Sequence, residues 1–339
     1  MAATRPSPRL CLSDDRAPGI TRRKLKHGWS YWSPEGERIT DRDKIDRLDA
    51  IGLPPAYRDA WFCPSPAGHI QAVGWDDKGR KQYRYHARFR DRRDALKYAR
   101  CAEFGRALPK LRARVEADLA RPDMSRERAV AAVVRLLDCA QVRVGNEDYA
   151  RANNSYGATT LRKQHARLRG SRFELSFQAK SGKHRELTIS DRALTRFVRK
   201  SHALPGQTLF GWIDDEGVAR AVTSADVNAY IRDAMGADFT AKHFRTWWAS
   251  VLAFEALAGA EGDISMKAML EPVAEALGNT PTIARNSYVH PRLINLAKKG
   301  QSVFRRKLVL PRRTRHLGRL ERALIDLLDR KRSPTAPSA

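Results

Sequence analysis

Residues 278–291 hold a tyrosine, Tyr288, with basic and polar neighbours that could take part in its chemistry. Arg285 lies about one helical turn before Tyr288, and Asn279 lies nine residues before it. A phenol has a reference pKa of about 10 and is a weak nucleophile at neutral pH. It reacts usefully only where cations stabilise the charge that develops on the attacked group. The alternative is a half-buried helix tyrosine without chemistry, so the other cations of the chain decide between the two interpretations.

The first such cation is Arg143, which follows a predicted helix. Ser125 is a suitable N-cap, and apolar residues after it recur at the spacing of one buried helix face. We expect this helix to end near residues 141–146, with Gly145 as the stop signal. Arg143 would then lie at a helix end beside a tight turn. The apolar stripe consists of Val130, Val133, Val134 and Leu137.

The second arginine, Arg245, lies in a predicted helix that opens at residue 241. Trp248, Ala249 and Leu252 suit the core-facing stripe of this helix. Arg245 precedes Trp248 by about one turn and lies on nearly the same face. We therefore expect Arg245 to emerge at the rim of the packed structure, with Lys242 one turn before it.

Residues 164–189 have the pattern of a three-stranded antiparallel meander whose second turn carries two lysines. Lys180 and Lys183 flank this turn. Lys180 has the opposite parity to the apolar residues of its strand, so it projects away from the core face. Such a lysine matters only where the turn reaches a substrate, and Lys180 and Lys183 stay alternatives. The apolar residues are Phe173, Leu175, Phe177 and Ala179.

A β-rich region precedes these elements. Residues 76–79 form a predicted turn, and a strand resumes over residues 80–86. Tyr83 and Tyr85 lie two residues apart and share one face of that strand. Because cations alternate with these aromatics, we interpret the hairpin as a ribbon that faces DNA. The residues between and beside the tyrosines are Arg80, Lys81, Gln82, Arg84 and His86.

Net charge is the strongest feature of the composition. The chain has 64 Lys and Arg against 38 Asp and Glu, a formal net charge of +26. This excess favours a nucleic-acid partner over an anionic membrane surface, because no amphipathic lipid-binding helix stands out. No apolar run approaches the ~20 residues that a membrane span needs. Four cysteines without a CxxC pair indicate reduced intracellular thiols, and we find no carboxylate cluster suited to a metal and no phosphate-binding glycine loop.

We predict an α+β protein of two domains, since 339 residues exceed one average domain. A small, mainly antiparallel β domain should precede a mostly α-helical domain that contains the three-stranded meander. The predicted boundaries are a flexible N-terminus over 1–18, the β-rich domain over 19–90, the helical domain over 91–310 with connecting helices over 91–120, and a basic C-terminal helix and disordered tail over 311–339.

The order of these residues resembles that of the type IB DNA topoisomerases, in their compact bacterial and poxviral form. Residues 79–85 resemble the N-terminal DNA-contacting hairpin of that family, and residues 143–146 its first catalytic arginine motif. Residues 240–246 resemble the second arginine motif, and Ser287-Tyr288 the nucleophile motif. The resemblance spans nearly the whole chain.

This resemblance implies a mechanism and a set of roles. Tyr288 would attack a DNA phosphodiester to form a 3′-phosphotyrosyl bond, and Arg143 and Arg245 would hold the non-bridging oxygens. Lys180 would protonate the 5′-oxygen that leaves. Strand rotation and religation would then relax positive and negative supercoils without ATP, metal or other cofactor. The DNA contacts implied are those of Arg80, Gln82, Tyr83, Tyr85, Lys183 and Lys242.

Asn279 departs from part of this family, since nuclear and poxviral members have histidine there and the bacterial branch has asparagine. An asparagine can donate a hydrogen bond to a phosphate oxygen but cannot act as an acid. The main alternative is a tyrosine recombinase, which shares the catalytic fold but usually has His-x-x-Arg where this chain has Lys242 three residues before Arg245. A non-catalytic basic DNA-binding protein is the third. We expect a cytoplasmic, nucleoid-associated monomer that forms a clamp around double-stranded DNA, with no membrane partner.

Overall fold

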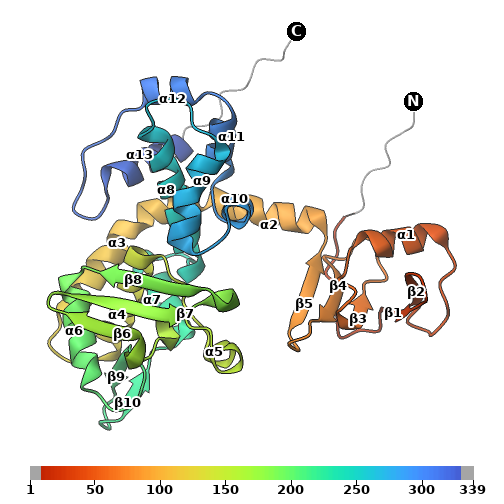
Figure 1. The fold of residues 1–339 in the computed structure, drawn as a ribbon, viewed down its shortest axis with the longest axis horizontal. Coiled ribbons are helices and arrows are strands. Elements are labelled where there is room, and N and C mark those ends of the chain that lie inside the picture. Colours follow the sequence, from red (N-terminus) through yellow and green to blue (C-terminus); the bar gives the residue numbers. More distant parts are fainter. Residues whose placement is uncertain (1–8, 330–339) are drawn as a thin grey trace. The chain divides into compact units, whose positions relative to one another are not determined.

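The computed structural model describes residues 9–329, and it divides into two compact units, residues 1–97 and 98–339. Helix α2 (Ala87–Ala99) continues from the first unit into the second. The domain boundary predicted at residues 90 and 91 falls inside this helix. The α+β class of the fold agrees with the prediction (Figure 1).

The first unit is built on a five-stranded antiparallel sheet in the order β2-β1-β3-β4-β5. Its core places Tyr31 edge-on to Phe62, with ring centroids 5.4 Å apart, and helix α1 covers it with the buried Leu48. The elements are β1 (Ile20–Lys24), β2 (Trp29–Trp32), α1 (Arg42–Ala50), β3 (Arg58–Phe62), β4 (Ile70–Trp75) and β5 (Lys81–Tyr85).

The segment before β1 is hydrogen-bonded to this sheet from Cys11 onward. The Cys11 amide donates to the Ala67 carbonyl at 2.9 Å, and the His69 amide donates to the Cys11 carbonyl at 2.9 Å. Asp15 forms an ion pair with Lys81 of β5. Residues 1–8 of the predicted flexible N-terminus lie outside the described residues.

The second unit contains the predicted meander, which is confirmed as a three-stranded sheet in the order β6-β7-β8. Phe173, Leu175 and Phe177 of β7 are buried on its core face, as their alternation predicted. The strands are β6 (Ala166–Arg169), β7 (Arg172–Gln178) and β8 (His184–Ile189), with a separate two-stranded ribbon of β9 (Gly211–Ile213) and β10 (Ala219–Ala221).

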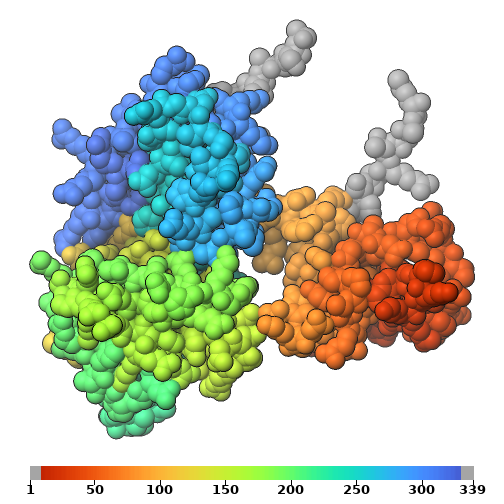
Figure 2. Space-filling model, viewed as in Figure 1, coloured from red at the N-terminus to blue at the C-terminus, as the bar shows by residue number. Residues whose placement is uncertain are grey.

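Helix α3 packs against α4, α7, α8 and α13, so it joins the sheet side of the unit to its C-terminal helices. Figure 2 shows the C-terminal helices, in cyan and blue, lying against the sheet region in green. The remaining helices are α3 (Cys101–Ala120), α4 (Arg126–Ala140), α5 (Glu147–Asn153), α6 (Arg192–His202), α7 (Ser224–Met235), α8 (Ala241–Ala258), α9 (Met266–Leu277), α10 (Pro281–Ser287), α11 (Pro291–Lys298), α12 (Gln301–Lys307) and α13 (Arg319–Asp329).

Helix α4 begins after Ser125 as predicted, and it ends at the start of the predicted range 141–146. Its C-cap is Gln141, which adopts the left-handed conformation at φ 51°. Gly145 was therefore wrong as the stop signal, although it too has a positive φ, 99°. A Cβ at Gly145 would approach the Thr159 hydroxyl to 3.0 Å, so this glycine allows two backbone segments to pack closely after the helix has ended.

The predicted core stripe of α8 was partly wrong. Trp247 is fully buried, whereas Trp248 and Leu252 are only partly buried, and Ala249 is buried as expected. The buried face follows from Phe244, Trp247 and Val251 at helical spacing. Arg245 lies inside the packed structure rather than at its rim, with 5% of its surface exposed.

In the C-terminal region, α12 separates α11 from α13. In α13, Leu324 is fully buried, and Leu320 and Leu327 pack partly buried against the core. Leu317 precedes the helix. Residues 330–339 of the predicted tail lie outside the described residues.

Candidate active site

Tyr288 lies directly at the end of α10 and is half-buried. The short helix is fixed at its start by Thr280, whose hydroxyl accepts a hydrogen bond from the Ile283 amide at 3.3 Å, and by Pro281 in its first turn. The Tyr288 amide donates to the Ala284 carbonyl at 3.1 Å. The tyrosine therefore has a defined backbone position at a helix terminus.

Arg245 lies against Tyr288, with its Cζ atom 4.8 Å from the centre of the tyrosine ring. Its Nη1 donates to the Gln141 carbonyl at 2.8 Å, and its Nη2 donates to the Leu277 carbonyl at 3.0 Å. These carbonyls belong to the C-terminal ends of α4 and α9, where the helix dipole favours a cation. Neutral partners thus hold the guanidinium without neutralising its charge.

Arg143 and Asn279 are brought together as predicted members of one site. Arg143 Nη2 donates to Asn279 Oδ1 at 2.9 Å. Because the amide oxygen is occupied in this way, the amide nitrogen points elsewhere. Asn279 Nδ2 is buried and has no hydrogen-bond partner within residues 9–329, and the same holds for Arg245 Nε. Both are free N–H donors.

The turn between β7 and β8 carries Lys180 and Lys183, and both side chains are exposed. Ser181 and Gly182 adopt positive φ values of 66° and 72°, which reverse the chain within two residues. The charge of Lys180 is one of the influences that lower the pKa of Tyr288. Lys180 and Lys183 stay alternatives for the proton donor.

Sequence reasoning missed Arg185 on β8. Its Nη1 and Nη2 donate to the Glu275 and Ala276 carbonyls at 3.0 and 2.9 Å, next to the Leu277 carbonyl that binds Arg245. Arg185 pairs with the buried Phe177 in the sheet, so its parity is that of the core face. The sequence did contain a signal for this residue, because an arginine near the end of a strand and on its core-facing side needs a partner inside the fold.

The charges of this cluster affect one another. Burial raises the pKa of Tyr288. The charge and hydrogen bond of Arg245, together with the charges of Arg143 and Lys180, lower this pKa by a larger amount, so the net shift is downward. Burial, followed by the charge of Arg143, lowers the pKa of Arg245 to about 10 and also lowers that of Arg185. Within residues 9–329 none of Arg143, Arg185 and Arg245 forms an ion pair with a carboxylate. The cluster has the character of an anion site.

The predicted DNA-contacting residues of the first unit lie on β5 and the turn before it. Tyr83 and Tyr85 stack with ring centroids 5.8 Å apart and are both exposed, as their parity predicted. Arg80 Nε and Gln82 Nε2 both donate to Asp76 Oδ2, at 2.8 and 3.0 Å. The hydrogen bond from Arg80 holds the pKa of Asp76 at about 2.

Lys242 is exposed in the first turn of α8. In the part of the chain that the structure describes, no group of three or more His, Cys, Asp or Glu side chains could hold a metal ion. Among the same residues no helix is long and apolar enough to cross a membrane.

Comparisons with known proteins cover both units. A family model described as the catalytic core of eukaryotic DNA topoisomerase I matches residues 86–302, and one described as the N-terminal domain of bacterial DNA topoisomerase IB matches residues 28–76. The DNA topoisomerase 1B of Acanthamoeba polyphaga mimivirus is 31% identical over 288 residues, which cover 81% of this chain and 85% of the viral protein. The chain belongs to the type IB DNA topoisomerase family.

More distant similarity is also present. The DNA topoisomerase 1B of Vaccinia virus (strain Copenhagen) is 19% identical over 229 residues, which cover 67% of this chain and 72% of the viral protein. A crystal structure of the XerH site-specific recombinase bound to difH substrate aligns with a TM-score of 0.36 and 17% identity, over 56% of this chain and 52% of that chain. The family match identifies a DNA topoisomerase, so of the three classes considered from the sequence the first is confirmed.

Proposed function

We propose that this protein relaxes positively and negatively supercoiled DNA by cutting and resealing one strand. The single observation that carries the proposal is the contact of Tyr288 with Arg245, whose buried guanidinium donates to the Gln141 and Leu277 carbonyls. A nucleophile beside cations without carboxylate partners suits attack on a phosphodiester, because the negative charge there grows in the transition state.

In the proposed reaction the Tyr288 oxygen forms a bond to phosphorus while the bond from phosphorus to the 5′-oxygen breaks. The products are a 3′-phosphotyrosyl linkage and a free 5′-hydroxyl. Arg143 and Arg245 stabilise the non-bridging oxygens, and Asn279 adds a hydrogen bond through Nδ2, which has no partner in the described structure. Lys180 donates the proton that the departing 5′-oxygen requires.

Religation is the same reaction in reverse, with the 5′-hydroxyl attacking the phosphotyrosine. The covalent bond conserves the energy of the phosphodiester, so we propose that neither ATP nor a metal ion is required. The hairpin residues Tyr83 and Tyr85, with Arg80 and Gln82, are proposed DNA contacts, as are Lys183 and Lys242. We further propose that the active form is a cytoplasmic, nucleoid-associated monomer that closes around one duplex.

Relaxation of plasmid DNA in the presence of EDTA tests this proposal. Positively and negatively supercoiled plasmids should both be relaxed without ATP. A strict requirement for Mg²⁺ or ATP would contradict it. Stimulation by salt or Mg²⁺ would not, because weaker phosphate binding speeds release of the DNA. Exchange of strands between two duplexes instead of relaxation of one would indicate recombinase activity.

A further inference from the structure

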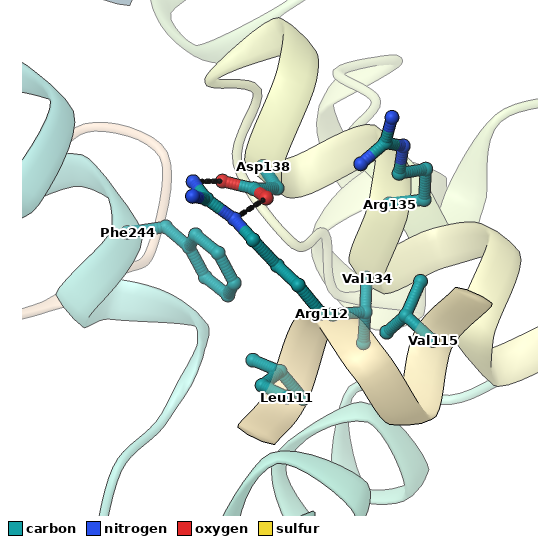
Figure 3. Close-up of a pocket in the computed structure, with 7 residues that line it drawn as sticks. All are labelled: Leu111, Arg112, Val115, Val134, Arg135, Asp138 and Phe244. Atoms are coloured by element: carbon teal, nitrogen blue, oxygen red, sulfur yellow. Dashed lines mark hydrogen bonds and ion pairs between the residues drawn. The ribbon is translucent and has the colours of Figure 1, made fainter. Parts of the chain in front are cut away.

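Three helices of the second unit meet at the buried guanidinium of Arg112, which lies on α3. Its Nε and Nη2 donate to the two carboxylate oxygens of Asp138 at 2.7 and 2.9 Å, the pairing drawn in Figure 3. Its Nη2 and Nη1 donate to the two oxygens of Glu321 at 2.8 and 3.0 Å. Nη1 also donates to the His316 carbonyl at 2.6 Å. All five N–H groups of the guanidinium are thereby used.

Two consecutive tryptophans connect α8 to this network. Trp247 Nε1 donates to Glu321 Oε1 at 3.2 Å, and Trp248 Nε1 donates to Asp138 Oδ1 at 3.0 Å. The side chains of Arg112, Asp138 and Glu321 are only 12%, 8% and 9% exposed. Charged hydrogen bonds with so little access to water have a fixed geometry, and removing one partner leaves a buried charge uncompensated.

The network adjoins the backbone that positions Arg245. Asp138 lies in the last turn of α4, three residues before Gln141, whose carbonyl accepts from Arg245 at 2.8 Å. On α8, Trp247 and Trp248 follow Arg245 by two and three residues. The network therefore fixes the distance between α4 and α8 close to Arg245. The hydrogen bond from Arg245 to the Gln141 carbonyl spans the same two helices, so its geometry depends on that distance.

Apolar packing does not fix this spacing alone. A small cavity lies between α3, α4 and α8, bordered by the buried Phe244 and Val134 as well as by Arg112 and Asp138 (Figure 3). Side chains next to a cavity lose packing contacts on that side. The ion pairs and tryptophan hydrogen bonds therefore add a directional constraint to the apolar packing here.

We propose that Glu321 of α13 is a positioning residue for strand cleavage, acting through Arg112 and Asp138 on the placement of Arg245. This inference rests on the proposed function. Helix α13 lies beyond residues 86–302, the part matched by the catalytic-core family model. The proposal thus gives α13 a role in supporting an active site whose proposed catalytic residues all lie on other elements.

The test measures single-turnover cleavage of a DNA substrate whose cut end cannot be religated, with four proteins. They are the wild type, Glu321→Gln, Arg245→Ala and the double variant. Glu321→Gln preserves the shape of the side chain and removes its charge. We expect it to slow cleavage by about tenfold in the wild-type background and by less than about twofold in the Arg245→Ala background. Non-covalent DNA affinity should not change, since Glu321 is proposed to act on the placement of Arg245 and not on the binding of DNA.

Asp329→Asn is the matched control. Like the bond from Arg112 to Glu321, the exposed ion pair between Arg106 and Asp329 at 2.5 Å joins α3 to α13. It should leave cleavage within about twofold of the wild type. If Glu321→Gln does not fold, Trp248→Phe removes the N–H that binds Asp138 together with part of the aromatic ring. It should slow cleavage by about threefold, again only when Arg245 is present.

Two results would overturn the inference. One is an unchanged cleavage rate in Glu321→Gln, or in Trp248→Phe where that variant is used. The other is an equal loss with and without Arg245, which indicates a general effect on the fold. Failure of the wild type to form a covalent complex would instead contradict the proposed function, so the two failures are distinguishable.

Discussion

Arg143 donates from Nη2 to Asn279 Oδ1 at 2.9 Å, and this bond leaves the Asn279 amide nitrogen as a donor without a partner in the described residues. One hydrogen bond therefore orients both side chains. The neutral amide of Asn279 binds Arg143 and leaves the positive charge of the guanidinium in place. A carboxylate at this position would neutralise that charge. That orientation makes residue 279 an acceptor for Arg143 and supports its proposed role as a donor to phosphate.

Replacing Asn279 with aspartate should test this pairing. Asn279→Asp keeps the acceptor for Arg143 but removes the donor and adds a negative charge beside the phosphate, so cleavage should slow by about two to three orders of magnitude. Asn279→His places an N–H donor at this position without adding a negative charge, so its cleavage rate should stay within about tenfold of the wild type. Single-turnover cleavage measures both. Equal rates for Asn279→Asp and the wild type would remove Asn279 from the site.

The depressed pKa of Tyr288 predicts a pH dependence of cleavage. At subsaturating DNA the cleavage rate should rise with pH as the phenolate forms and then reach a plateau. The midpoint of this rise should lie below about 10, the pKa of free tyrosine. In Arg245→Gln, burial of the phenol loses its main opposing influence, so the midpoint should move upward. An unchanged midpoint in this variant would show that Arg245 does not stabilise the attacking phenolate.

Lys180 and Lys183 can be distinguished by changing the leaving group. If Lys180 is the general acid, Lys180→Ala should lose about two to four orders of magnitude in cleavage rate. Sulfur in place of the 5′-bridging oxygen leaves without a proton, so cleavage of that substrate by Lys180→Ala should approach the wild-type rate. Arg245→Ala should show no such rescue. If only Lys183→Ala is rescued by the sulfur substrate, Lys183 and not Lys180 is the general acid.

His290 predicts how stability of the second unit depends on pH. Burial and then the charge of Arg292 lower its pKa to about 4, while its Nδ1 accepts from the Arg292 amide at 3.0 Å at the start of α11. The unfolded chain therefore binds a proton at higher pH than the folded chain. Stability present above about pH 6.5 is lost as the pH falls towards 4, by about 3 kcal/mol in total.

Urea unfolding at about pH 7 and about pH 4.5 measures this loss. His290→Asn keeps an oxygen that can cap α11 and does not titrate. Its free energy of unfolding should fall by about 2 kcal/mol less than that of the wild type over this interval. Identical losses in the two proteins would show that His290 is not the group responsible.

The sequence predicted those features of the site that depend on local pattern. The β7–β8 hairpin follows from strand alternation and a tight turn, and the common face of Tyr83 and Tyr85 follows from strand geometry alone. Local spacing determines each of these, so a single chain carries enough information for them.

The features that were not predicted depend on partners far away in the chain. Arg245 is buried because carbonyls of Gln141 and Leu277, 104 and 32 residues away, bind its guanidinium. Helix α4 ends at Gln141, a residue that takes the left-handed conformation less readily than glycine does. Arg185 is part of the site only because α9 ends beside β8. No periodicity within one segment contains this information.

The central claim is that Tyr288 forms a covalent bond to the 3′-phosphate of a cut DNA strand. Reacting the protein with DNA that cannot be religated, followed by protease digestion and mass spectrometry of the DNA-linked peptide, tests it most directly. The account predicts a peptide with the DNA 3′-phosphate attached to Tyr288, and no adduct from Tyr288→Phe, which should fold and bind DNA normally. Attachment at Tyr83 or Tyr149, or adduct at wild-type yield from Tyr288→Phe, would contradict it.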